Sequence, residues 1–363
     1  MTTMIDPTLF ETETETETDS ESEPRGLLDA PTARLLLPAD APEEQWHATR
    51  AAGIGGSDVA AILGLDRYRG PRHVFEDKHG RPTFKGNEAA EIGTEIEGFI
   101  AGLFSKRSGV PIAMPPGTLV HIEHPWARVN VDRYTCDADG SVTGLLECKN
   151  RSAYQLDDWE DGVPDAPALQ THWGMAVGGW THGYVAALVG GNRLLWHRLE
   201  RDDEMIAYLL DFCGRWFQRH VVEGFEPEAD GLEATAELLS KLWSVKPEAV
   251  AEVDVTKAKE LRAKALDLKA RAKGVAEELR AVENEIRLLT GENEIAQADG
   301  TAVWTWKANG TFASKRFTED EPDLAAAYTH MVPALDVDRL KDEQPEKYAA
   351  YRARVLRIPA KGI

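Results

Sequence analysis

The sequence contains few cysteines, and their spacing excludes several kinds of site. Cys136, Cys148 and Cys213 are the three cysteines among 363 residues, and no two of them form a C-x-x-C pair. Structural zinc sites and disulfide frameworks both need closely patterned cysteines, so neither is predicted. Three thiolates are also too few for an iron–sulfur cluster held by four. We therefore expect a protein of a reducing compartment.

Long apolar runs, a signal peptide and a nucleotide-binding loop are missing as well. No segment is apolar over the roughly 20 residues that a membrane helix needs. The N-terminus lacks the basic-then-apolar pattern of a secretory leader. No Gly-Lys-Ser/Thr follows the glycine-rich segment 53–56, so ATP-driven chemistry is not predicted. We expect a cytoplasmic protein without a membrane partner.

Basic residues are outnumbered, with 41 lysines and arginines against 62 acids and a formal net charge of −21. Any nucleic-acid binding must therefore be confined to a local groove. Much of the acidic excess lies in Met1–Glu43, which has eleven acids, two arginines and the run ETETETETDSESE. We predict that residues 1–43 are a disordered acidic tail and that order begins near Glu44.

The most informative stretch is residues 129–150, VNVDRYTCDADGSVTGLLECKN. Alternation at its start, an Asp- and Gly-rich middle and a strand-like end predict a β-hairpin. Successive side chains of a strand point to opposite faces, so Glu147 and Lys149 share one face. Asp132 lies just before the bend and can meet Glu147 across the hairpin. Two carboxylates and an ammonium group are therefore expected to converge.

Such a cluster suits a hard divalent cation and phosphate chemistry. Carboxylate oxygens are ligands that Mg²⁺ prefers, and a lysine can orient a nucleophile or neutralise charge on a phosphate. The alternative is a surface hairpin with a cross-strand ion pair, because Asp followed at variable distance by Glu-x-Lys is a weak pattern. The spacing alone does not decide between them.

Two segments before this hairpin are candidates for phosphate contacts. In residues 46–64, WHATRAAGIGGSDVAAILG, a glycine-rich turn precedes a predicted helix with Ser57 and Asp58 as candidate N-caps. Together with Arg50 this turn could seat a phosphate, or it could simply be a capped helix with a flexible lead-in. Residues 67–85 are the most basic stretch, which suits a DNA backbone or a solvated helix and loop.

Residues 88–108 are predicted to form an amphipathic helix, because their apolar side chains recur with a period near 3.6. Glu97 stands at the edge of the apolar stripe. An inward-facing carboxylate is costly unless it is paired or bound to a metal. Glu97 is therefore a further candidate ligand.

Taken in order, these blocks resemble a known family. The blocks are GIGGSDVAAILGL, IGTEIEGFIAGLFSKRSG, VNVDRYT with GLLECKN, SAYQLDDWEDGVP and LQTHWGMAVGGWTHGYVAALVGG. They are similar to the successive motifs of the YqaJ-type viral recombinases, phage nucleases related to lambda exonuclease within the PD-(D/E)xK superfamily. The resemblance covers about residues 46–216. It implies an α/β (α+β) nuclease core, with a mixed central sheet flanked by helices, that cuts DNA with Mg²⁺, for which Mn²⁺ can substitute.

The resemblance also implies roles for individual residues. The implied catalytic and metal-binding groups are Asp132, Glu147, Glu97, the main-chain carbonyl of Cys148, and Lys149. The implied phosphate-binding residues are Arg50, Ser57, Asn130 and Gln170. Asn130-Val131-Asp132 departs from the usual Ser-Pro-Asp of the family, although asparagine can still donate to a phosphate. A second family glutamine is replaced by His172, which we expect to be a packed core histidine.

Residues after the active hairpin are predicted to complete a nuclease domain over 44–225. Tyr184–Leu188 and Leu194–Leu199 predict two strands joined at Gly190-Gly191-Asn192. Asp203–Phe217 predicts a closing helix.

Residues 226–363 are predicted to form a separate appendage. A 4-3-4-3 apolar pattern over four heptads predicts a long helix over 257–290, with Leu261, Ala265, Leu268, Ala272, Val275, Leu279, Val282, Ile286 and Leu289 in its seam. The seam fits an intermolecular coiled coil or an intramolecular helical hairpin, and its alanines favour the hairpin. A small β-hairpin ending at Asn309-Gly310 and a short helical tail are expected to follow.

These observations predict a metal-dependent exonuclease that degrades linear double-stranded DNA ends for phage-type recombination in a bacterial host. The alternatives are a restriction-type or structure-specific endonuclease of the same fold, and a non-catalytic DNA-binding or interaction module. Expected partners are double-stranded DNA and, from the resemblance, a single-strand annealing protein and further copies of the chain.

Overall fold

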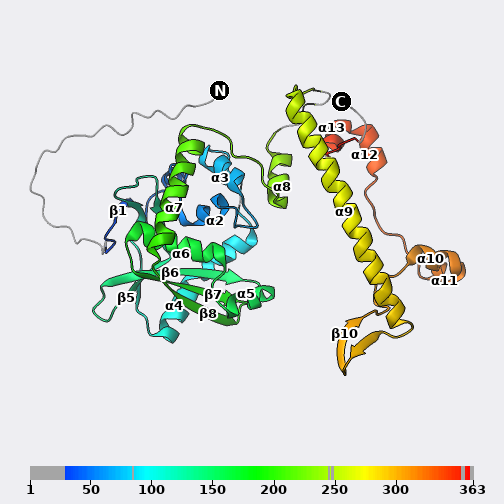
Figure 1. Cartoon of the computed structure of the whole chain (residues 1–363), viewed down its shortest axis with the longest axis horizontal. Helices are drawn as coiled ribbons and strands as arrows, with labels where there is room; N and C mark the ends of the chain where they lie inside the picture. The colour runs from blue at the N-terminus through cyan, green and yellow to red at the C-terminus, as the bar shows by residue number, and fades with distance from the viewer. Residues whose placement is uncertain (1–28, 84–85, 244–245, 247–248, 353–355, 360–363) are drawn as a thin grey trace, which may run out of the picture. The chain divides into compact units, whose positions relative to one another are not determined.

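The computed structural model describes residues 29–83, 86–243, 246, 249–352 and 356–359 (Figure 1). The chain divides into two compact units, here called the N-terminal unit (up to Trp243) and the C-terminal unit (from Ser244). Within the described ranges, no helix has both the length and the apolar character needed to cross a bilayer.

A five-stranded mixed sheet forms the centre of the N-terminal unit, in the order β2-β5-β6-β7-β8. Its strands are antiparallel except for β6 and β7, which run parallel. A parallel pair needs a crossover connection, and α6 provides it. The strands are β2 (Ile112–Ala113), β5 (Arg133–Cys136), β6 (Val142–Arg151), β7 (His182–Val189) and β8 (Arg193–Glu200).

Helices cover both faces of this sheet, as the alternation along β6 requires. Leu145 packs with Trp173 and Met175 of α6 (Asp165–Gly178), whereas Leu146 packs with Ile100 and Phe104 of α4 (Glu88–Ser108). The bounds of α4 confirm the predicted helix. The mixed sheet flanked by helices confirms the predicted fold class.

The approach of α6 to the sheet depends on glycine. A Cβ at Gly174 would lie 2.6 Å from Cδ2 of the buried Leu145, and a Cβ at Gly183 would lie 2.5 Å from Cγ2 of Thr171. A side chain at either position would push the helix away from the strands, because a close-packed interior leaves no room for it.

A second, antiparallel sheet corrects the prediction for the N-terminal tail. Its order is β1-β3-β4, with β1 at Ala33–Pro38, β3 at Gly117–His121 and β4 at Arg128–Val129. Thr32 Oγ1 also donates to the carbonyl of Val177 at 2.9 Å. Disorder over 1–43 is therefore wrong for residues 29–43, while residues 1–28 lie outside the described residues. The acidic composition concealed a strand whose partner lies some 80 residues later in the chain.

The remaining helices of the N-terminal unit surround the sheets. The β7–β8 hairpin and α7 confirm the predicted strands and closing helix. The unit extends past the predicted boundary at residue 225, because α8 contacts α3 and Glu226 Oε2 pairs with Arg72 Nη1 at 2.7 Å. The helices are α1 (Glu43–Ala51), α2 (Gly56–Ile62), α3 (Pro71–Lys78), α5 (Leu156–Glu160) after a 3₁₀ turn (Ala153–Gln155), α7 (Asp203–Trp216) with a π-helical end (Phe217–Val222), and α8 (Glu233–Lys241).

The C-terminal unit is built on one long helix, α9 (Val255–Thr290). Its bounds confirm the long helix predicted over 257–290. The predicted intramolecular helical hairpin is wrong for the described residues, because the large seam residues of α9 are exposed rather than packed against a second helix. A β-hairpin follows, but it turns at Asp299-Gly300, both with positive φ, rather than at Asn309-Gly310. The other elements are β9 (Ile295–Ala298), β10 (Thr301–Thr305), α10 (Ser314–Asp320), α11 (Pro322–Ala327), α12 (Val337–Glu343) and α13 (Pro345–Ala350).

Candidate active site

Asp132, Glu147 and Lys149 meet at one end of the central sheet. Asp132 directly precedes β5, and Arg133 is opposite Leu146 of β6, which brings Asp132 beside Glu147. The Oδ2 atom of Asp132 accepts a hydrogen bond from the backbone N–H of Cys148 at 2.7 Å. The predicted meeting of Asp132 and Glu147 across the hairpin is therefore present.

This acidic pair is unfavourable without a compensating cation. Glu147 is only 3% exposed. Burial raises the pKa of Asp132 well above its ordinary value, the charge of Glu147 raises it further, and Lys149 opposes both. Lys149 Nζ pairs with Glu147 Oε1, so one ammonium group stands against two carboxylates.

Gln170 of α6 completes the contacts around Glu147. Its Nε2 donates to Glu147 Oε1, and its Oε1 accepts from Lys149 Nζ at 3.0 Å. The amide therefore bridges the acid and the lysine and fixes the orientation of both. The family resemblance pointed to Gln170, which lies on α6, the helix between β6 and β7.

Glu97 lines the same cavity but has a partner of its own. The cavity measures about 290 Å³, and its lining includes Glu97, Asp132, Glu147, Cys148 and Lys149. Glu97 Oε1 accepts from Arg133 Nη1 at 2.6 Å, a contact that the sequence pattern did not reveal. Among the residues that the structure describes, no three His, Cys, Asp or Glu side chains are already drawn together as a metal site. Arg133 and Lys149 instead compensate the acids.

The donor set nevertheless fits a hard divalent cation. Carboxylate and carbonyl oxygens are the ligands that Mg²⁺ takes in proteins, and they surround this cavity. The excess negative charge of Asp132 and Glu147 is the property that a cation would relieve. The residues able to hold it are Asp132, Glu147, Glu97 and Cys148 through its carbonyl.

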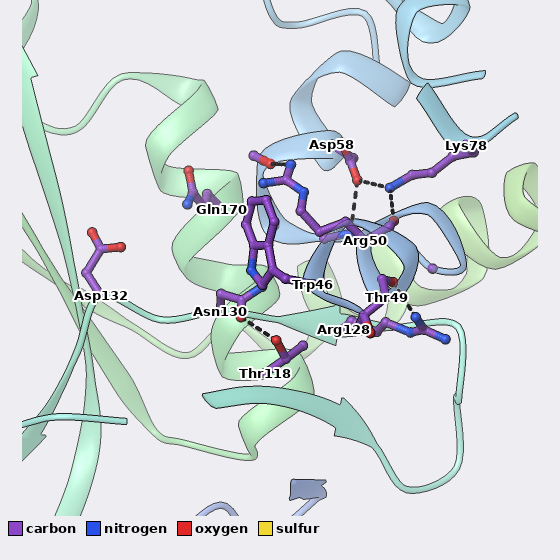
Figure 2. A pocket seen from close by; sticks show the side chains of 14 residues that line it. Trp46, Thr49, Arg50, Asp58, Lys78, Thr118, Arg128, Asn130, Asp132 and Gln170 are labelled. Atoms are coloured by element: carbon purple, nitrogen blue, oxygen red, sulfur yellow. Dashed lines mark hydrogen bonds and ion pairs between the residues drawn. The ribbon is translucent and has the colours of Figure 1, made fainter. Parts of the chain in front are cut away.

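A second cavity, of about 240 Å³, contains the candidate phosphate-binding residues (Figure 2). Arg50 Nη2 donates to Ser57 Oγ at 3.2 Å, and the guanidinium lies 4.9 Å from the ring centroid of Trp46. Asn130 is fixed by Thr118, whose hydroxyl donates to its Oδ1 at 2.6 Å. The structure thus brings together the four predicted residues, Arg50, Ser57, Asn130 and Gln170.

The two cavities share Asp132, and Gln170 connects them. Asp132 lines both of them, and Gln170 lines the second while it touches the acid and lysine of the first. A phosphate held by Arg50 would therefore lie next to the acidic cluster.

The start of α2 differs from the prediction. Neither Ser57 nor Asp58 is the N-cap, because the helix begins at Gly56 with Gly55 as its N-cap. Asp58 is instead the third helical residue, and its Oδ2 accepts from the N–H of Gly55 at 3.1 Å. An acid at this position satisfies a backbone donor at the helix start, as in half of a capping box.

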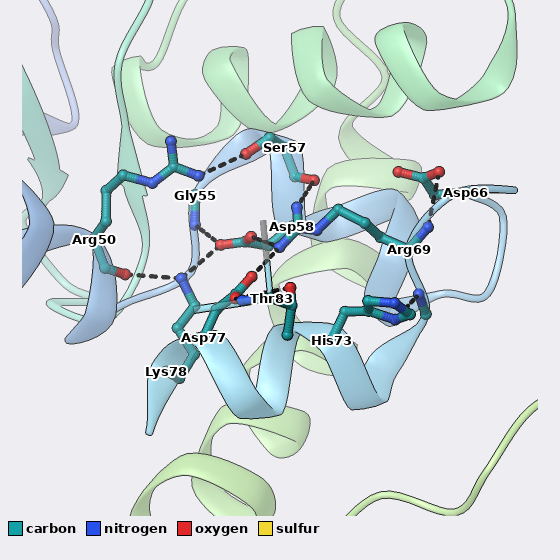
Figure 3. A network of polar contacts seen from close by, with 11 residues as sticks. Arg50, Gly55, Ser57, Asp58, Asp66, Arg69, His73, Asp77, Lys78 and Thr83 are labelled. Atoms are coloured by element: carbon teal, nitrogen blue, oxygen red, sulfur yellow. Dashed lines mark hydrogen bonds and ion pairs between the residues drawn. The ribbon is translucent and has the colours of Figure 1, made fainter. Parts of the chain in front are cut away.

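Asp58, which lines the second cavity together with Lys78, also anchors a buried network (Figure 3). Lys78 Nζ donates to Asp58 Oδ2 at 2.7 Å and to the carbonyl of Arg50 at 2.8 Å. Arg69 Nη2 contacts Asp58 at 3.3 Å and Asp77 at 2.8 Å. Burial alone would raise the pKa of Asp58, but Lys78 and Arg69 outweigh it and hold this pKa well below its ordinary value.

This network corrects the interpretation of residues 67–85 as a free basic stripe. Arg69, Arg72, Lys78 and Arg81 all pair with acids of the protein itself. Arg69 and Lys78 connect α3 and the segment before it to α2 through Asp58, and Lys78 also binds the Arg50 carbonyl. Arg72 and Arg81 pair with Glu76 of α3. His172, expected in the core, is indeed buried, and its lowered pKa follows mainly from burial.

The mixed sheet flanked by helices is the fold class that the family resemblance implied. The chain belongs to the YqaJ-like viral recombinase family. The sequence profile of the YqaJ-like viral recombinase domain matches residues 45–181. The chain is 34% identical over 225 residues to the "uncharacterized protein YqaJ" of Bacillus subtilis (strain 168), covering 61% of this chain and 67% of that protein.

Solved structures show weaker likeness. The alkaline exonuclease LHK-Exo of Laribacter hongkongensis is 19% identical, with a TM-score of 0.41 over 50% of this chain and 93% of that chain. A phage related exonuclease of Haemophilus somnus 129PT is 13% identical, with a TM-score of 0.38 over 47% and 96% of the two chains.

Proposed function

We propose that the N-terminal unit is a divalent-cation-dependent deoxyribonuclease that degrades linear double-stranded DNA from its ends in phage-type recombination. The observation that carries this proposal is the position of Asp132, which lines both the acid–lysine cavity and the cavity of Arg50. A site that holds a terminal phosphate beside its hydrolytic centre acts on ends. Membership of a viral recombinase family supports the same activity.

Each group has a definite task in this proposal. Asp132, Glu147, Glu97 and the carbonyl of Cys148 would hold Mg²⁺ or Mn²⁺. When bound, the cation makes a water molecule a better nucleophile and offsets the charge that develops on the reacting phosphate. Lys149, oriented by Gln170, donates to the attacking water or to the phosphate oxygens.

The second cavity binds the end of the DNA. Arg50 supplies a cationic fork for the terminal phosphate, and the hydroxyl of Ser57 lies within its reach. Asn130 and Gln170 add neutral donors. Arg50, Ser57 and Asn130 do not carry the reaction itself, so their loss alters selectivity and binding before it alters the chemical step. Loss of Gln170 would in addition disturb Lys149, which it orients.

The test compares three DNA substrates in buffer containing Mg²⁺, with EDTA as the metal-free control. We expect rapid degradation of linear duplex with a 5′-phosphate, slower degradation of the same duplex with a 5′-hydroxyl, and survival of covalently closed circles. Arg50→Ala should reduce the preference for phosphate by about 10-fold or more, since a charge-assisted hydrogen bond contributes about 1.5–3 kcal/mol. Arg50→Lys should retain part of it.

Other outcomes would decide for the alternatives. Cutting of closed circles at discrete sites would establish an endonuclease. Binding to duplex without turnover in Mg²⁺ or Mn²⁺ would establish a non-catalytic module. Glu147→Gln serves as the inactive reference in every assay.

A further inference from the structure

The long helix α9 presents an apolar stripe to solvent. Among its described side chains, Leu268 is 48% exposed and Leu289 is 70% exposed. The other large stripe residues with high exposure are Leu261, Val275, Leu279 and Val282. A surface helix normally covers such a stripe against a neighbouring element.

The spacing of the stripe identifies the kind of neighbour. Its residues repeat every 3.5 positions over α9, which is the period of a coiled-coil seam. The a positions are Ala258, Ala265, Ala272, Leu279 and Ile286. The d positions are Leu261, Leu268, Val275, Val282 and Leu289. A second helix of similar length and period is therefore the expected occupant.

The sizes of the seam residues select an orientation. In an antiparallel pair of identical helices, each a residue faces a d residue of the other copy. When the two helices cross with their midpoint between residues 273 and 274, every alanine faces a larger residue of the other copy. The layers are Ala258 with Leu289, Ala265 with Val282, Ala272 with Val275, Leu279 with Leu268, and Ile286 with Leu261. A parallel pair would instead create three layers of alanine against alanine, which fill the seam poorly.

The charges beside the seam select the same orientation. The g positions are Lys257, Lys264, Arg271, Glu278 and Glu285, and the charged e positions are Arg262, Lys269 and Glu283. Each flank is basic in the first half of α9 and acidic in the second. In a parallel pair g faces e of the partner, so Lys264 would meet Lys269 and Glu278 would meet Glu283. In an antiparallel pair g faces g, so Lys264 meets Glu285 and Arg271 meets Glu278.

Contacts within one copy leave these charges able to pair. Arg271 with Asp267 and Glu283 with Arg287 are exposed pairs along the helix, which contribute little and break easily. Arg262 donates to the carbonyl of Pro359 at 2.9 Å and is not part of a proposed pair.

We propose that α9 is a self-association surface that binds α9 of a second copy of this chain in an antiparallel two-stranded coiled coil. Two features of the helix, the size pattern of its seam and the charge pattern of its flanks, lead to this orientation separately. The proposal does not depend on the nuclease function.

Disulfide cross-linking of the full chain tests the orientation. Leu261 and Ile286 lie near opposite ends of α9 and share a layer only in the antiparallel pair. We expect Leu261→Cys alone and Ile286→Cys alone to give little dimer on a non-reducing gel, whereas an equal mixture gives a dimer after mild oxidation. The parent chain is the background control, since its cysteines are buried. Self-linking of both single variants would show a parallel coil, and no linking in the mixture would overturn the proposal.

Charge reversal supplies a second test that does not alter the seam. One full chain carries Lys264→Glu with Arg271→Glu, and a differently tagged chain carries Glu278→Lys with Glu285→Lys. Each variant alone should pair with itself several-fold more weakly than the parent, because like charges then face each other. Mixed together, they should copurify, because every g contact is again between opposite charges. Equal copurification in all combinations would refute the antiparallel assignment.

Discussion

The two units of this chain depart from the usual distribution of residues in opposite ways. The N-terminal unit buries charged side chains, including Asp58, Lys78 and Glu147. The C-terminal unit exposes large apolar side chains along α9. Buried charge is costly unless a partner compensates it, and exposed apolar surface is costly unless a partner covers it. Asp58 has its partners Lys78 and Arg69 within the fold. For the acidic pair Asp132 and Glu147 and for the exposed stripe of α9, we propose partners outside the chain.

The largest effect is expected on DNA cleavage, at the two carboxylates that we propose bind the metal ion. Asp132→Asn or Glu147→Gln should lower DNA cleavage by at least about 10³-fold, because each removes a candidate metal ligand without changing volume. The melting temperature should stay the same or rise, because one of two repelling carboxylates is neutralised. Cleavage and thermal melting are measured on the same preparations. Asp139→Asn, in the exposed β5–β6 turn, is the matched control, and full activity in either variant would contradict the assignment.

Removing a buried charge whose partner lies within the fold should lower the stability of the protein. Asp58→Ala leaves Lys78 buried without its carboxylate, which should cost about 3–5 kcal/mol of unfolding free energy. Chemical denaturation followed by tryptophan fluorescence measures it. Glu237→Ala, which breaks the exposed pair with Lys241, should leave stability unchanged. Equal stability of the Asp58 and Glu237 variants would show that burial does not distinguish these pairs.

A smaller effect is expected from a buried group that is neutral at neutral pH. Burial lowers the pKa of His172, so the folded protein binds a proton there less readily than the unfolded chain does. Stability should therefore fall as the pH drops below about 6.5, the ordinary pKa of histidine. His172→Gln should make this fall shallower. Denaturation at pH 7.5 and 5.5 measures the slope, with the exposed His47→Gln as control. An unchanged slope in the His172 variant would exclude a contribution from this histidine.

The smallest effect on stability is expected on the exposed stripe. Leu268→Asp with Leu279→Asp should change the unfolding free energy of the isolated chain by no more than about 0.5 kcal/mol, as at other surface positions. The same pair should abolish the cross-linking described for α9. Ala270→Asp, on the outer face of the helix, should preserve it. A large stability loss would show that the stripe packs within a single chain.

Local patterns in the sequence were sufficient to predict several of these features. The period of α4 gave its bounds, and the alternation around Glu147 placed two acids and a lysine at one end of a sheet. Such features depend on neighbours within a strand or a helix. The sequence also pointed to Asp132, where the two cavities meet, because both the predicted hairpin and the family resemblance single out this residue.

Long-range contacts account for what the sequence did not reveal. β1 pairs with a strand far along the chain, and the pattern of residues 33–38 is too short to distinguish from a tail. The ion pairs of Arg133 with Glu97 and of Lys78 with Asp58 join residues from different elements. No rule of sequence spacing predicts such pairs. The period of α9 predicted a long helix over 257–290, but its alanines also fitted packing within the chain, which the exposed seam does not show among the described residues.

The contact between α2 and α6 links the two cavities mechanically. A Cβ at Gly56 would lie 3.0 Å from Cγ and 3.3 Å from the carbonyl oxygen of Gln170, so the two helices meet there with no side chain between them. Gln170 in turn touches Glu147 and Lys149. A methyl group at Gly56 would require Gln170, whose amide contacts Lys149, to give way by a few tenths of an ångström. Gly56 has no functional group, yet a substitution there would affect both cavities, because Gln170 contacts residues of each.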